Sequence, residues 1–220
     1  MGALIGTADR CVHPGYLISI LLPLPFYRCS TKQFTMSSES DAIKNVAGLM
    51  ALAARTAPKA VGIDSITIEI ISGKEQEKIA EKMILIAAET GMDFFRINGE
   101  QVRVSDATVL IGVGGKKTLG LNCGGCGYAT CNEMAEACTA AKSHKTHYMG
   151  PNCIFKVSDL GIAVGSAVKT ASMHNVDNRI MYSAGVAAMQ LGIIKGCSIV
   201  YGIPLKASGK NIYFDVAMKH

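Results

Sequence analysis

Apolar residues recur at helical spacing in two segments of the first half of the chain. The first segment begins near Asp41 and ends before Pro58, because the residue before a proline avoids helical backbone. Its apolar stripe consists of Ile43, Val46, Ala47, Met50, Ala53 and Ala54. The second segment, Lys74–Thr90, ends at Gly91, a residue that readily adopts the left-handed conformation of a helix C-terminus. Both segments are predicted to be amphipathic helices.

Three shorter segments have the patterns of strands. Ser65–Ile71 alternates apolar and polar residues, which predicts a strand with one buried face. Ala107–Val113 is a continuous apolar run, and such runs are typical of strands that are buried on both faces. Ser198–Ile203 is a further short strand.

Two helices rich in Ala and Gly are predicted between the last two strands, at Asp159–Met173 and Asn178–Leu191. We interpret Asp177 as the N-cap of the second helix, Arg179 as a residue of its first turn and Gly192 as its end. Helices and strands follow one another along the chain without an internal repeat. This order predicts an α/β (α+β) fold.

Composition excludes several classes of protein. With 18% charged and 49% hydrophobic residues the chain is not a disordered protein. Aromatic residues make up only 6% and the net charge is +5, too little for a nucleic-acid surface. No apolar run approaches the roughly 18 residues of a membrane span. We therefore expect a cytoplasmic protein with neither nucleic acid nor membrane among its partners.

The first 36 residues differ from the rest of the chain. Tyr16–Tyr27 is apolar but contains Pro23 and Pro25, and no small-residue cleavage site of a signal peptide follows it. Residues 1–36 are predicted to be a poorly ordered N-terminal extension, or an over-long start with Met36 as the true initiator.

Five of the eight cysteines fall between residues 123 and 153, which favours a metal protein over a disulfide scaffold. Cys123, Cys126 and Cys131 have the spacing C-x2-C-x4-C, and the glycines between them permit a tight turn around one centre. Thr130 and Glu133 form a capping box that begins a helix at Cys131. The positive end of that helix dipole favours a negatively charged centre.

The fourth ligand is chosen between two cysteines. Cys138 lies seven residues after Cys131, two turns and about 10 Å along the same predicted helix. Cys153 follows the turn Met149–Asn152, which can return the chain to the other cysteines. We assign Cys153 as the ligand and Cys138 as a small buried side chain beside Met134 and Ala135.

An iron–sulfur cluster suits four cysteines with a glycine-rich turn. Structural zinc is the alternative, because His144 and His147 follow the cysteines and would complete a Cys2His2 ligand set. The other interpretation of Lys142–His147 is a solvated, cationic helix end.

The stretch Asn122–Cys131 resembles the four-iron four-sulfur domain of the corrinoid iron–sulfur protein of acetyl-CoA synthesis, although the gap to the fourth cysteine is longer here. From about Ser38 to Asp215 the chain resembles an uncharacterised family of prokaryotic ferredoxin-domain proteins. The matching stretches are Leu52–Asp64, Gly150–Cys153, Asp159–Ala167, Val176–Arg179 and Gly209–Asp215. The resemblance implies a [4Fe–4S] cluster and electron transfer.

That family in turn looks distantly like nitroreductases, which are FMN enzymes. Ala54–Pro58 resembles their A-R-x-A-P segment, but Lys59 and Gly62 stand where nitroreductases have the Ser and Asn that lie against the flavin. The resemblance implies a nitroreductase-like scaffold, FMN as a further cofactor and a homodimer. The candidates for holding the flavin phosphate are Arg55, Lys59 and Lys210.

Together these observations predict an α/β domain formed by residues 37–118 and 154–220, with an inserted iron–sulfur module at 119–153. We call residues 119–153 the cysteine module. The predicted function is that of a redox protein, an oxidoreductase or electron carrier, which passes electrons to a flavin or to a redox partner protein. The resemblance of the module to the corrinoid iron–sulfur protein implies, as a further hypothesis, electron donation to a corrinoid or other one-carbon enzyme. The alternative is a non-catalytic module that zinc or a cluster stabilises.

Overall fold

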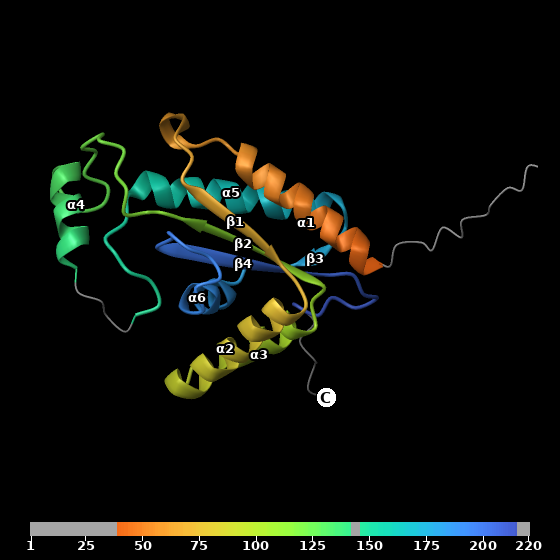
Figure 1. Ribbon diagram of the computed structural model, residues 1–220. Coiled ribbons are helices and arrows are strands. Elements are labelled where there is room, and N and C mark those ends of the chain that lie inside the picture. The colour runs from red at the N-terminus through yellow and green to blue at the C-terminus, as the bar shows by residue number, and fades with distance from the viewer. Residues whose placement is uncertain (1–38, 142–145, 215–220) are drawn as a thin grey trace, which may run out of the picture. The chain divides into compact units, whose positions relative to one another are not determined.

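Four antiparallel strands form one sheet in the order β1-β2-β4-β3 (Figure 1). β1 (Ile66–Ile71) pairs with β2 (Ala107–Val113), which in turn pairs with β4 (Ile199–Lys206). β3 (Asp177–Asn178) adds a short pairing to the end of β4. All seven residues of β2 are buried, which explains why this strand reads as a continuous apolar run.

The computed structural model describes residues 39–141 and 146–214, which all belong to the unit Thr35–His220. The predicted N-terminal extension, residues 1–36, lies outside the described residues. Among the described helices, none combines the length and the apolar character that crossing a membrane requires.

Helices α1 (Glu39–Thr56) and α5 (Ile154–Met173) cover one face of the sheet. The buried stripe of α1 includes Ile43 and Met50, which pack with Leu160 of α5 in one apolar cluster. Burying an Ile, Leu or Met side chain contributes about 1.5–3 kcal/mol, so this cluster is a main source of stability. The stripe predicted for α1 is confirmed, although Ala53 is only half-buried.

Helices α2 (Lys74–Thr90), α3 (Asp93–Arg103) and α6 (Tyr182–Gln190) cover the opposite face and form a second apolar cluster. The contact between α6 and β4 is unusually close. A Cβ atom added to Gly185 would lie 1.8 Å from the Val200 carbonyl oxygen, so only glycine permits this approach.

Some predicted elements need correction. Helix α3 was not predicted, and α5 begins five residues earlier than expected. Asp177 is not a helix cap, because it lies in β3 opposite Lys206 and the N-cap of α6 is Met181. Arg179 precedes α6, and its Nη1 donates a hydrogen bond to the Tyr213 carbonyl.

The cysteine module contains helix α4 (Cys131–Ala140) and lies in chain order between β2 and α5. In Figure 1, α4 lies beside the end of the sheet at which α5 begins. The module is therefore placed next to the N-terminal end of α5, where Cys153 is found.

Candidate metal centre

The four cysteines assigned as ligands line one small hollow. Cys123, Cys126 and Cys131 lie in the turn and at the start of α4, and Cys153 is the last residue of the module, directly before α5. The other residues that line the hollow are Asn122, Gly124, Tyr128, Thr130, Met134 and Ile154. All four cysteines are free thiols. The structure thus brings together the side chains that the spacing and the turn at 149–152 were expected to bring together.

Helix α4 begins at Cys131 because of a capping arrangement. The Glu133 N–H donates to the Thr130 Oγ1 over 3.2 Å, and the Glu133 carboxylate accepts from the Ala129 N–H over 3.1 Å. In the usual capping box the carboxylate returns to the N–H of the cap residue itself, so here it reaches one residue further back. The predicted cap is confirmed, and Cys131 occupies the first turn of the helix.

The turn before Cys131 depends on residues with positive φ. Gly124 (φ +71°) and Gly127 (φ +89°) are joined by a hydrogen bond of 2.9 Å from the Gly127 N–H to the Gly124 carbonyl. Asn122 also has positive φ (+47°), which asparagine tolerates better than most residues. Its Oδ1 accepts from the Cys131 N–H over 2.8 Å, and its own N–H donates to the Cys131 Sγ over 3.3 Å. This clamp was not predicted.

Cys153, the last residue of the module, approaches the hollow from the start of α5. Its side chain is buried, with 6% exposed, and its N–H donates over 2.8 Å to the Gly115 carbonyl at the end of β2. It is also the N-cap of α5. The turn of the module touches the same place, since a Cβ atom on Gly125 would lie 2.7 Å from the Ile154 Cγ2. Two helix N-termini, those of α4 and α5, therefore border the hollow and favour negative charge there.

Cys138 does not line the hollow. Its thiol donates to the Pro151 carbonyl over 3.3 Å, and desolvation raises its pKa above the usual value. The side chain is half-buried, whereas we expected a buried one.

Of the two histidines in the zinc alternative, the structure describes His147, whereas His144 lies outside the described residues. The His147 ring centroid is 5.2 Å from that of Phe95, and its Nδ1 is hydrogen-bonded to the Tyr182 hydroxyl. His147 is thus part of an aromatic cluster and not of the end of α4, which finishes at Ala140. Sequence reasoning missed this cluster.

Within residues 39–141 and 146–214, no three Cys, His, Asp or Glu side chains meet closely enough to hold a single metal ion. The four cysteines nevertheless line the same hollow. An all-cysteine donor set, arranged around a space and supplied with a backbone N–H donor to one sulfur, fits an iron–sulfur cluster.

The three candidates for a flavin phosphate do not come together in one chain. Arg55 donates to the Asp64 carboxylate over 2.5 Å and to the Ile66 carbonyl over 2.7 Å. The Lys59 ammonium donates to the Ala54 and Arg55 carbonyls at the end of α1.

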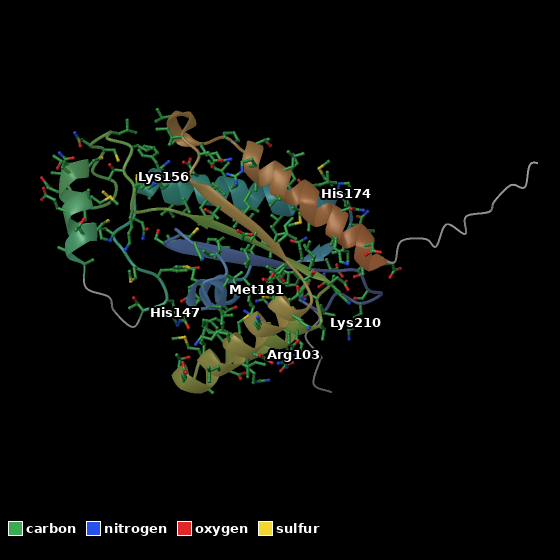
Figure 2. All side chains as sticks on the ribbon, viewed as in Figure 1. Arg103, His147, Lys156, His174, Met181 and Lys210 are labelled. Atoms are coloured by element: carbon green, nitrogen blue, oxygen red, sulfur yellow. The ribbon has the colours of Figure 1, made fainter. Side chains whose placement is uncertain are left out.

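Lys210 lies beyond the C-terminal end of β4, next to Asn211, whose side chain donates to Asp177. Figure 2 shows Lys210 far from Lys156, which is near the other end of the sheet. Arg55 lies at the same end of the sheet as Lys156, where it donates a hydrogen bond to the carbonyl of Ile66, the first residue of β1. The flavin assignment itself stays a prediction.

Fold and site define an iron–sulfur protein of the mixed α/β class, and the comparisons with known proteins agree. Residues 120–144 match a family model described as "Putative Fe-S cluster", and residues 149–216 match the family "Uncharacterized protein containing a ferredoxin domain" (DUF2148). A protein of Archaeoglobus fulgidus with the name "Uncharacterized protein" is 46% identical over 181 residues, which are 82% of this chain and 95% of that protein. The chain belongs to this family of proteins containing a ferredoxin domain.

Solved structures similar to this chain include proteins named as nitroreductases. A nitroreductase-like family protein from Bacillus cereus has 10% identity and a TM-score of 0.48, with 76% of each chain covered. Nitroreductase A from Vibrio parahaemolyticus has 13% identity and a TM-score of 0.44, and the chain spans 60% of its length. The α/β class follows from the strands and helices described above.

Proposed function

We propose that the protein transfers electrons through a [4Fe–4S] cluster bound by Cys123, Cys126, Cys131 and Cys153. The observation that carries the proposal is the hollow that these four cysteines line together. Four cysteine thiolates are the ligand set of such clusters, and the family matches support an iron–sulfur cofactor. The cluster would supply one-electron chemistry.

The residues around the hollow would stabilise the negative charge of a thiolate-bound cluster. Cys131 and Cys153 stand at the starts of α4 and α5, where the unpaired N–H groups carry positive partial charge. The Asn122 N–H donates to the Cys131 sulfur, and hydrogen bonds to sulfur help to set the reduction potential of a cluster.

The rim of the hollow would allow exchange of electrons with a redox partner protein. Cys123 is exposed, and the neighbouring apolar residues Leu121 and Ile154 are 49% and 42% exposed. An exposed ligand within an apolar rim supports close approach of another protein. We propose such a partner in the cytoplasm.

FMN is proposed as the alternative electron partner, in keeping with the resemblance to nitroreductases. Arg55 and Lys59 lie together at the end of α1. In this proposal the two cations bind the flavin phosphate side by side. Lys210 belongs to the opposite end of the sheet, so its participation would require the predicted homodimer, in which a second copy supplies it.

Anaerobic purification of the full chain tests the proposal. We expect a brown protein with four iron and four acid-labile sulfide per chain and visible absorption that bleaches on reduction. A colourless protein with one zinc and no sulfide would instead establish the structural zinc module. Flavin released by acid from the same sample reports on FMN separately.

A matched pair of variants tests the ligand assignment. Cys153→Ser removes the cysteine that lines the hollow, and we expect loss of the cluster or its conversion to a three-iron form. Cys138→Ser removes a thiol outside the hollow and is expected to cost about 1 kcal/mol of stability while iron content stays at the wild-type value. Depleted iron in Cys138→Ser with full iron in Cys153→Ser would overturn the assignment.

A further inference from the structure

A cavity of about 520 Å³ lies on the scaffold beside the cysteine module. Its walls come from four parts of the chain: the segment that enters β1, the end of β2, the first turn of α5 and the loop before β4. The lining residues that matter for the argument are Ile63, Asp64, Ser65, Ile66, Lys117 and Lys156. A volume of this size is typical of sites for small organic ligands.

Lys156 places a buried positive charge in the wall of this cavity. The residue is only 1% exposed, and its ammonium donates to the Ile63 carbonyl over 2.9 Å. An ammonium has three N–H donors, so the hydrogen bond recorded among the described residues uses one of them. Because burying a charge without partners is costly, a ligand that accepts the remaining hydrogen bonds would be stabilised here.

The Ser65 hydroxyl is a second buried polar group in the wall of the cavity, and the described residues give its Oγ no hydrogen-bond partner. A buried hydroxyl without a partner costs free energy, and a ligand oxygen could accept its hydrogen.

The charge balance of the cavity is positive. Lys117 joins Lys156 in the wall, and Asp64 is the acidic residue among those that line it. The Asp64 carboxylate is already occupied by Arg55 and by the Ile66 N–H. An adjoining cavity of about 300 Å³ shares Lys117 and adds Lys116.

We infer that this cavity binds a small organic anion, whose carboxylate or phosphate group is held by Lys117 and Lys156 and accepts a hydrogen bond from Ser65. Ile63 and Ile66 provide apolar surface for the body of the molecule. The site lies one helical turn from Cys153, since Lys156 follows it by three residues on α5. The inference stands on the cavity alone and is independent of the cofactor that the cysteines hold.

Calorimetric titration of the full chain with phenyl phosphate, benzoate and inorganic phosphate tests the inference. Phenyl phosphate or benzoate is expected to bind saturably at one site per chain and more tightly than inorganic phosphate, because the ring gains apolar contact. The preference between the two organic probes distinguishes a phosphate ligand from a carboxylate ligand. Equal or tighter binding of inorganic phosphate would overturn the organic ligand, and no saturable binding would overturn the site.

Variants identify the cavity as the place of binding. Lys117→Met is expected to weaken binding roughly tenfold and Ser65→Ala about threefold, since the first removes a charged ammonium and the second a neutral hydroxyl donor. Lys169→Met removes the same charge from an exposed position of α5 and should change the Kd less than twofold. Equal weakening by Lys117→Met and Lys169→Met would show a non-specific charge effect and overturn the inference.

Lys156 is not mutated in this test, because it is buried and its replacement can prevent folding. The variants of Lys117 and Ser65 therefore test the site. Iron and sulfide are measured on the same samples. A variant that loses anion binding but keeps a full cluster affects this inference alone. Anion binding by protein without a cluster would leave this inference intact and count against the proposed electron transfer.

Discussion

The scaffold and the cysteine module are held together in different ways. In the scaffold every residue of β2 is buried, and two apolar clusters pack against the two faces of the sheet. In the module Met134 is the buried residue of α4, and most of the turn that holds Cys123 and Cys126 is exposed. Hydrophobic burial therefore stabilises the scaffold, whereas the module relies on positive-φ turns, a helix cap and, in our proposal, its cofactor.

This difference implies that the two regions have separate stabilities. A segment with few buried apolar contacts opens at a lower free energy than the core of the same protein. Metal binding to cysteines contributes directly to the folding free energy of the region that supplies them. Perturbations of the scaffold should thus unfold the whole domain, and perturbations of the module should act locally.

The largest effect is expected from Gly185→Ala. The new methyl group would overlap the Val200 carbonyl oxygen, so α6 would have to move away from β4. We expect a loss of about 4 kcal/mol or more, or no soluble protein. Gly165→Ala is the control, because a Cβ there meets nothing within 4 Å on α5 and alanine favours a helix by about 1 kcal/mol. Urea unfolding of both variants measures the difference; similar stabilities would contradict the close packing.

Removing the metal tests whether the module opens alone. After anaerobic chelation we expect residues 119–141 to lose protection from hydrogen exchange and to become sites of proteolysis, because α4 lacks a core of its own. The amides of β2 should stay protected, since they lie in the centre of the sheet. Hydrogen exchange followed by mass spectrometry reads both regions at once. Simultaneous loss of protection in β2 would mean that cofactor and scaffold fold as one unit.

Thr130→Ala is expected to have a smaller and local effect. It removes the side-chain oxygen that accepts the Glu133 N–H, which costs about 1 kcal/mol of helix stability. Release of iron to a chelator should accelerate, while the urea midpoint of the scaffold stays unchanged. Thr139→Ala, in the last turn of the same helix, removes an exposed hydroxyl that donates to the Ala135 carbonyl and should leave iron release unchanged. Equal rates in both variants would contradict the capping role.

The smallest effect is expected at Asp64. Burial raises the pKa of this carboxyl, but hydrogen bonds from the Ile66 N–H and from Arg55 outweigh burial and bring the pKa below 3.8. A lowered folded-state pKa means that the charged group adds stability above pH 3.8, and this stability is lost as the pH falls through the folded-state pKa. Because the pair is partly exposed, Asp64→Asn should cost only about 0.5 kcal/mol at pH 7.

The cost of Asp64→Asn should shrink as the pH falls below 4, and urea unfolding at several pH values measures it. Asp93→Asn is the comparison, since it removes the carboxylate of an exposed pair on α3. A cost at Asp64 that grows toward acid would contradict the sign of the pKa shift.

Sequence alone determined the elements whose signals are local. The predicted bounds of α2 and β2 agree with the structure, because a left-handed glycine at position 91 ends the first and a continuous apolar run marks the second. The cap at Thr130 lies within three residues of its partner, so its pattern is readable without a fold. The cysteines of the candidate metal centre and the glycines between them are local signals of the same kind.

Elements that depend on distant partners could not be predicted. Helix α3 buries Asn98 against the Ser183 side chain and carries Gly99 in its middle, so its buried face does not read as apolar. Asp177 has the chemistry of a helix cap, but pairing with Lys206, almost thirty residues away, makes it part of a strand. Tertiary pairing overrode local preference in both places.

Only the tertiary structure decided which side chains share a site. Cys153 meets the other cysteines because its N–H binds Gly115 at the end of β2. Lys117, Lys156 and Ser65 line one cavity although they come from three separate segments, and no spacing in the sequence relates them. Caps, turns and hydrophobic periodicity act over a few residues, and a sequence displays them directly. Burial and the convergence of charges depend on how distant segments pack, and that arrangement is settled only when the sheet and its helices come together.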